Sequence, residues 1–161
     1  MKSALKVIGI DPGLAETGFG IVQGSGSRIG DYTFGTIRTS KAETLPDRLH
    51  YIFSELSSVL NSQKPDLMVI EDIFSLKKYP KSGIALGKVC GVILLACSQC
   101  GITTMEVPVR EVKRILTGNG KATKRQMERA VRHFLKRDTP ITPSHASDAI
   151  ALALVGIFRR A

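Results

Sequence analysis

Tryptophan is absent from this chain of 161 residues, only three cysteines occur, and no apolar run is long enough to cross a membrane. The longest such run, residues 149–158, is about half of the roughly 20 residues that a spanning helix needs. The segment before Asp11 carries two lysines and no continuous apolar stretch of the kind found in a secretory signal. These absences argue against a membrane or exported protein, and we expect the chain to be cytoplasmic.

The few cysteines also bear on metal binding. Cys90, Cys97 and Cys100 all fall in one expected helix. Cys97 and Cys100 have the C-x-x-C spacing of half a zinc site, but the chain has no second pair of this kind. We therefore expect reduced, buried thiols rather than zinc ligands.

Acidic residues are in the minority: 14 Asp and Glu stand against 23 Lys and Arg, for a formal net charge of +9. Residues 77–137 hold 14 basic and 3 acidic side chains, whereas the remaining residues hold 9 basic and 11 acidic ones. A basic surplus can simply be a solvated surface that keeps a protein soluble. Its concentration in one stretch favours a surface that binds a polyanion, and nucleic acid is the natural candidate.

Apolar residues make up 43% of the chain, and we expect residues 1–161 to form a single domain. Apolar patterning predicts five strands, over residues 6–10, 18–23, 28–37, 67–70 and 103–107, with a turn at 24–27. It predicts five helices, over about 44–63, 82–99, 109–116, 123–136 and 144–159. This order predicts an α/β fold, a mixed five-stranded sheet with helices on both faces, in which strands 6–10 and 67–70 are parallel neighbours.

Three acids stand at the ends of apolar elements, where an ionised carboxylate is costly to bury without a cation. Asp11 and Glu71 each follow an apolar strand, and Asp148 opens an apolar helix one turn after His145. Because the two strands are expected to be parallel neighbours, Asp11 and Glu71 should lie side by side. Taken singly, each acid has an ordinary explanation, as part of a tight turn, a solvated strand end or a helix N-terminal charge.

Together, the three carboxylates favour a metal site. Neighbouring carboxylates repel one another, and a hard divalent cation such as Mg²⁺ removes that conflict and prefers oxygen ligands. Two such ions about 4 Å apart can activate a water and stabilise the leaving oxygen of a phosphodiester. His145 is a further ligand, a group that orients the water, or only a polar cap. In a basic chain, this arrangement predicts an enzyme that cuts nucleic acid.

The motifs around these acids resemble the RuvC family of Holliday junction resolvases, within the ribonuclease H-like superfamily. They cover nearly the whole chain and comprise Gly9–Gly13, Thr17–Gly20, Ile70–Phe74, Ala85–Lys88 with Gly91, Val112–Lys113, Gly118–Gly120 and Ser144–Ala149. The resemblance implies that Asp11, Glu71, His145 and Asp148 are both the catalytic and the metal-binding residues. His145 stands where the family often has Asp, which leaves open whether it binds metal or moves a proton.

The resemblance also implies the activity of a crossover junction endodeoxyribonuclease. Such an enzyme makes paired symmetric nicks in four-way DNA, with 5′-phosphate ends, in homologous recombination and DNA repair. The implied cofactor is Mg²⁺, replaceable by Mn²⁺, with two ions per site when substrate is bound. The implied partners are the junction DNA, a second copy of the chain, and the branch-migration motor of RuvA and RuvB. A protein that binds junctions without cutting them is the alternative, but it would be expected to lack one of the acids. A nucleotide-binding enzyme of the actin-like class needs two such domains, for which the chain is too short.

One aromatic residue and five lysines are expected at the DNA: Phe74, Lys77, Lys78, Lys113, Lys121 and Lys124. Lys113 and Lys124 match the family's two functional basic positions, and Phe74 matches an aromatic placed against a base near the cut. A ring among cations suits stacking on an unpaired base. We expect the amides of residues 118–120 to open the following helix and hold a phosphate. The helix 82–99 is apolar around much of its circumference, which predicts the dimer interface.

Overall fold

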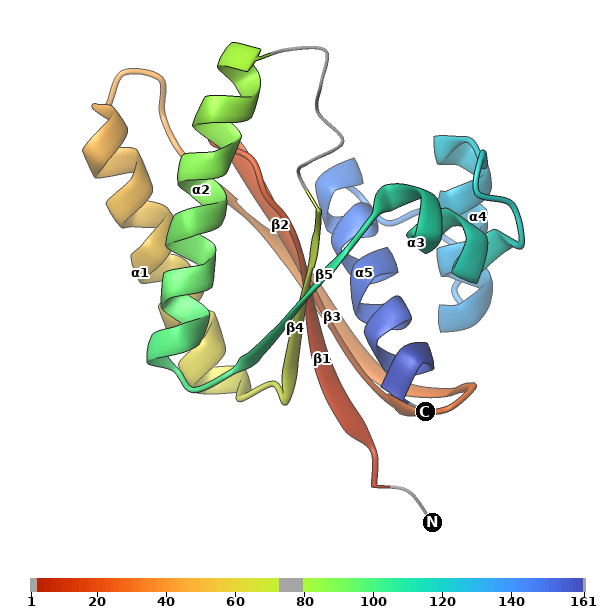
Figure 1. Cartoon of the computed structure of the whole chain (residues 1–161). Helices are drawn as coiled ribbons and strands as arrows, with labels where there is room; N and C mark the ends of the chain where they lie inside the picture. Colours follow the sequence, from red (N-terminus) through yellow and green to blue (C-terminus); the bar gives the residue numbers. More distant parts are fainter. Residues whose placement is uncertain (1–2, 73–79, 161) are drawn as a thin grey trace.

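A computed structural model describes residues 3–72 and 80–160, which form one mixed sheet between two layers of helices (Figure 1). The strands are β1 (Leu5–Asp11), β2 (Glu16–Ser25), β3 (Arg28–Arg38), β4 (Leu67–Glu71) and β5 (Thr103–Val107). The helices are α1 (Leu45–Gln63), α2 (Pro80–Gln99), α3 (Val109–Thr117), α4 (Lys124–Leu135) and α5 (Ser144–Arg160). Helices α1 and α2 cover one face of the sheet, and α3, α4 and α5 lie on the other.

The strand order is β3-β2-β1-β4-β5. The first three strands form an antiparallel meander, and β1, β4 and β5 run parallel to one another. The predicted α/β fold, with strands β1 and β4 as parallel neighbours, is therefore confirmed. This pairing matters for the site because parallel neighbours end at the same edge of the sheet.

Local signals explain where the helices begin and end. Thr44 caps α1, because its Oγ1 accepts the amide N–H of Asp47 at 3.3 Å. Gly101, with φ of 68°, follows α2 and takes the left-handed conformation that ends many helices. Helix α2 begins at Pro80, two residues before the expected start, and proline suits the first helical position because the N–H it lacks would have no helical partner.

The hairpin between β2 and β3 is tighter than the sequence suggested. Ser25 pairs with Arg28, so the turn consists of Gly26 and Ser27 rather than the expected residues 24–27. Gly26 has φ of 59°, which a two-residue hairpin turn requires and glycine adopts without strain. Strand β2 also begins two residues earlier than predicted, because Glu16 still pairs with Arg38 of β3.

Two apolar cores lie on opposite faces of the sheet. Ile8 and Ile10 of β1 pack toward α1 and α2, whereas Val7 of the same strand packs toward α5. This alternation follows from the two-residue period of a strand. Nearly the whole of α5 is buried from residue 146 to residue 157, which makes it the central helix of its face.

Cys90 and Cys97 are buried in α2, and Cys100 follows directly after that helix. Burial raises the pKa of the Cys90 thiol to about 11, so it stays protonated at neutral pH. Within residues 3–72 and 80–160, no helix combines the length and the apolar character needed to cross a membrane.

Candidate active site

Asp11 and Glu71 end two neighbouring parallel strands. The register places Ile10 of β1 beside Ile70 of β4, so the next residue on each strand, Asp11 or Glu71, lies at the same edge of the sheet. Because side chains alternate along a strand, both acids point to the face that α5 covers, opposite to the two isoleucines. The strand ends thus bring two carboxylates beneath the start of α5.

Glycines of β1 and β2 let α5 lie directly on the strands. A Cβ at Gly9 would come within 1.9 Å of the α5 backbone, and a Cβ at Gly18 within 2.1 Å of the carbonyl oxygen of His145. Gly18 is also the cross-strand partner of Asp11. Residues without a Cβ are therefore required for this close approach. The N-terminal part of α5, with His145 in its first turn and Asp148 one turn later, is held over the end of β1 as a result.

The turn that follows Asp11 is fixed by Thr17, whose side chain is fully buried. Its Oγ1 donates to the carbonyl oxygen of Gly13 at 2.7 Å and accepts the amide N–H of the same residue at 3.3 Å. Thr39 ties down the next residue, because its Oγ1 donates to the carbonyl oxygen of Leu14. These bonds hold the loop between β1 and β2, and with it the carboxylate of Asp11.

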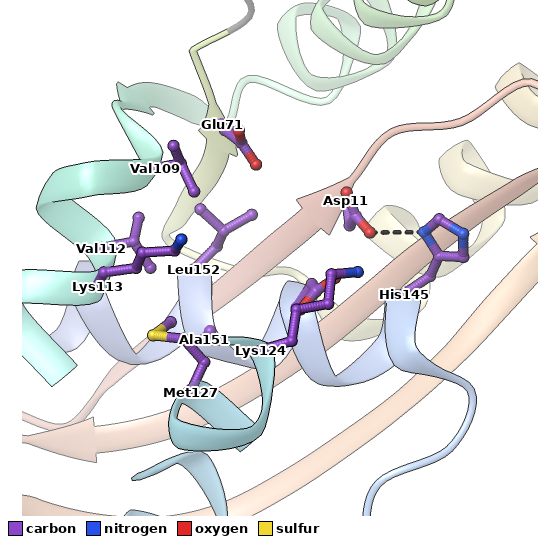
Figure 2. Close-up of a pocket in the computed structure, with 11 residues that line it drawn as sticks. Asp11, Glu71, Val109, Val112, Lys113, Lys124, Met127, His145, Ala151 and Leu152 are labelled. Carbon is purple, nitrogen blue, oxygen red and sulfur yellow. Dashed lines mark hydrogen bonds and ion pairs between the residues drawn. The ribbon is translucent and has the colours of Figure 1, made fainter. Parts of the chain in front are cut away.

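The four residues expected to act together line one cavity of about 350 Å³ (Figure 2). Asp11 and Glu71 reach it from the strand ends, and His145 and Asp148 reach it from the N-terminal part of α5. The cavity brings together groups as far apart in the sequence as Asp11 and Asp148.

Part of the cavity wall is apolar, which the sequence did not reveal. It consists of Val109, Val112, Met127, Ala151 and Leu152, from α3, α4 and α5. The helical periodicity of these segments was the available signal, and it does not distinguish a cavity wall from a core. An apolar wall beside carboxylates lowers the local dielectric and strengthens their interaction with a cation.

Two of the acids are paired with basic side chains of the chain itself. Nδ1 of His145 lies 2.6 Å from Oδ2 of Asp11 and donates a hydrogen bond to it (Figure 2). Nζ of Lys124 lies 3.7 Å from Oδ2 of Asp148. In the described part of the chain, no three acid, histidine or cysteine side chains stand close enough together to enclose a metal ion.

Burial and the neighbouring carboxylates disfavour ionisation of Asp11 and Glu71. The pKa of Asp11 is raised, chiefly by burial, although the hydrogen bond from His145 acts in the opposite direction. The pKa of Glu71 is raised to about 6 by burial and by the charges of Asp11 and Asp148. A divalent cation stabilises such carboxylates in their ionised form, and three oxygen donors fit a hard ion. The donor chemistry of the site therefore suits a metal such as Mg²⁺.

The basic residues expected at the DNA fall into three groups. Lys113 and Lys124 line the cavity, whereas Lys121 is exposed and lies outside its lining. Phe74, Lys77 and Lys78 lie outside the described residues. Exposed basic side chains continue along α3 and α4 beyond the cavity, namely Arg110, Arg114, Arg125 and Arg129. The basic residues of α3 and α4 therefore border the acids on one side.

The turn at residues 118–120 lies before the helix that we expected it to open. Helix α4 begins only after Thr123, which caps it, so the turn does not open the helix. The amide of Asn119 donates to Oγ1 of Thr117 at 3.1 Å, and the amide of Lys121 donates to Oδ1 of Asn119 at 2.9 Å. The amide of Gly118 donates to the backbone carbonyl oxygen of Arg114. The expectation that this turn opens the following helix was wrong, and the phosphate site itself stays a prediction.

Comparison with known proteins gives one family. A family model described as "Crossover junction endodeoxyribonuclease RuvC" matches residues 7–156. A curated relative of that name from Rhodopirellula baltica is 36% identical over 154 residues, which is 96% of this chain and 86% of the relative. Another, from Thermosipho melanesiensis, is 38% identical over 149 residues, which is 92% of this chain and 94% of the relative.

Solved structures agree with the sequence matches. Thermus thermophilus RuvC superposes with a TM-score of 0.86 at 28% identity, covering 97% of this chain and 96% of that one. The same protein in complex with a Holliday junction substrate gives a TM-score of 0.90 at 28% identity, covering 97% and 94%. A yeast mitochondrial Holliday junction resolvase, 12% identical with a TM-score of 0.62, shares the fold over 99% of this chain and 80% of that one.

Proposed function

Because the chain belongs to the RuvC family of crossover junction endodeoxyribonucleases, we propose that it resolves four-way DNA junctions by paired symmetric nicks that leave 5′-phosphate ends. One observation carries this proposal: three carboxylates and a histidine line one cavity, and basic helices border it. In this proposal residues 1–161 are one nuclease domain, which acts in the cytoplasm in homologous recombination and DNA repair.

The family is metal-dependent, and we assign the metal to Asp11, Glu71 and Asp148. The proposed ion is Mg²⁺, replaceable by Mn²⁺, with two ions per site when DNA is bound. When bound, the metal would supply a Lewis acid and an activated water for phosphodiester hydrolysis. The chain's own residues position the groups for this chemistry. Thr17 fixes the loop after Asp11, and Gly9 and Gly18 let α5 lie directly on the strands.

His145 has two possible roles in this mechanism. Its Nδ1 is engaged by Asp11, which leaves Nε2 to bind metal or to move a proton of the attacking water. Measuring the Mn²⁺ affinity of the His145→Ala variant distinguishes the two roles. If His145 is a metal ligand, the variant binds Mn²⁺ more weakly. If His145 moves a proton, the variant binds Mn²⁺ as before, and the pH profile of cleavage changes.

The basic residues provide the DNA contacts in this proposal. Lys113 and Lys124 face the cavity, where the scissile phosphate would lie, and Lys121 extends the basic surface outward. Phe74, with Lys77 and Lys78 close to it in the sequence, is assigned to an unpaired base near the cut. Phosphate contacts position a nucleic acid without reading its sequence, which suits an enzyme that selects a structure.

A homodimer completes the proposal. On α2, Ile84 and Leu95 are 63% and 52% exposed, which is unusual for large apolar side chains. Gly91 lies on the same side of the helix, and a Cβ built there would meet nothing within 4 Å. An exposed apolar stripe with a glycine suits close packing against a second copy of α2, and a two-fold axis would place one site on each of two junction strands. The branch-migration motor of RuvA and RuvB is the further partner that we propose.

A cleavage assay tests the function directly. A synthetic four-way junction is incubated with the protein and Mg²⁺, with chelator as the control, and the products are separated on a denaturing gel. We expect metal-dependent nicks at symmetric positions, and Asp11→Asn should abolish them while junction binding persists, because charge rather than shape is lost. Binding without any cleavage by the unmodified protein would instead favour the junction-binding alternative, and full activity of Asp11→Asn would contradict the site assignment.

A further inference from the structure

The contact between Lys124 and Asp148 has a consequence for metal loading. Lys124 is the first residue of α4, where the helix dipole disfavours a cation, and the first turn of α4 holds no acid that would compensate. Its ammonium lies 3.7 Å from Oδ2 of Asp148 across the cavity. The position of this lysine is therefore explained by the acids that it faces rather than by its own helix.

The charge of Lys124 acts on all three acids of the site. It pairs with Asp148, and it also favours the ionised forms of Asp11 and Glu71, whose carboxyls lie in the same cavity. A divalent ion at Asp148 would meet this ammonium beside the same oxygen, and like charges so close repel. Lysine and metal therefore compete for Asp148.

Lys124 is free to leave this position. Its side chain is 84% exposed, against 42% for that of Asp148, so no packing holds the ammonium in place. A DNA backbone that enters the cavity offers it a phosphate oxygen, which attracts an ammonium at least as well as a carboxylate does. Lys121 and Arg125, both exposed, lie close in sequence and would draw the backbone to the same side.

We propose that Lys124 is an internal counter-ion that holds Asp148 closed to metal until DNA backbone draws the lysine away. This inference rests on the proposed function, since it takes the three acids as the metal site. It makes junction DNA and metal bind cooperatively, and reciprocity requires each to raise the affinity for the other by the same factor. The free enzyme then carries less metal, and nicking is restricted to complexes in which DNA is already seated.

Metal binding without DNA is the direct test. Mn²⁺ titrations followed by electron paramagnetic resonance compare the unmodified protein with Lys124→Met, Lys124→Arg and Lys121→Met. Because the ion pair is exposed, its removal in Lys124→Met should tighten Mn²⁺ binding only about two- to fivefold. Lys124→Arg keeps the cation and should match the unmodified protein. Lys121→Met removes an equal charge outside the cavity lining and should also match it.

The titrations are repeated with a four-way junction that carries uncleavable backbone linkages, and a gel confirms that its strands stay intact. The junction should tighten Mn²⁺ binding to the unmodified protein by more than it does for Lys124→Met. The proposal is overturned if Lys124→Met binds Mn²⁺ no more tightly than the unmodified protein, or if Lys121→Met gains as much. Asp148→Asn separates this failure from a wrong metal site: unchanged Mn²⁺ binding by that variant would refute the proposed function itself.

Discussion

Replacing Gly18 by alanine tests whether the close approach of α5 to β2 positions the catalytic groups. The new Cβ would lie 2.1 Å from the carbonyl oxygen of His145, whereas ordinary contacts begin at 3.4 Å. The neighbour is helix backbone, which cannot rotate away, so α5 must shift by about 1.3 Å at its first turn. A shift of this size would break the 2.6 Å hydrogen bond between His145 and Asp11.

The expected loss is much larger for activity than for stability. Overpacking a core contact costs about 1–3 kcal/mol, which for a chain of this size lowers Tm by roughly 2–12 °C. Misplacing catalytic groups by about 1 Å can lower the rate roughly 100-fold. We therefore expect Gly18→Ala to remain folded at 25 °C, as circular dichroism would show, and to cut a four-way junction about 100-fold more slowly.

Gly30→Ala is the matched control. It makes the same change in the neighbouring strand β3, at an exposed position where the nearest atom to a Cβ is 3.4 Å away. Its cleavage rate should equal that of the unmodified protein. If Gly18→Ala is folded and cuts as fast as the unmodified protein, the close contact between Gly18 and the backbone of α5 does not position the site, and the prediction is refuted.

Three further predictions concern pH, salt and assembly. The pKa of Glu71 is higher in the folded protein than in the unfolded chain, so the folded state is favoured while this carboxyl is protonated. As pH rises from 4.5 to about 6, the free energy of unfolding of the metal-free protein should therefore fall by about 1 kcal/mol, a value that allows for solvent screening. Urea unfolding in chelator measures this slope, and Glu71→Gln should reduce it, leaving the part that comes from the raised pKa of Asp11. Lys113→Ala should reduce the dependence of junction affinity on salt by about one phosphate contact, and an unchanged slope in titrations at several salt concentrations would place Lys113 away from the backbone. Leu95→Asp should sediment as a monomer at micromolar concentration. A monomeric unmodified protein, free and on junction DNA, would exclude paired nicking by a dimer.

The sequence alone determined the order and approximate limits of the elements. Apolar periods, Thr44 as a cap and Gly101 as a helix end are local signals, and local signals act between residues a few positions apart. The acids were visible for a related reason, since an ionised group at the end of an apolar strand conflicts with its own surroundings. A resemblance in the motifs then assigned His145 to the same set, which its position one turn before Asp148 made plausible.

Only the tertiary structure decided how these groups meet. Asp11 and His145 are 134 positions apart, and no local pattern encodes a 2.6 Å contact between them. The glycines of β1 and β2 were read as parts of motifs, but their need for a close backbone approach appears only once α5 lies on the sheet. The pairing of Lys124 with Asp148 and the apolar cavity wall likewise join separate helices. Such contacts depend on the relative placement of whole elements, which is fixed by packing through space rather than by the order of residues along the chain.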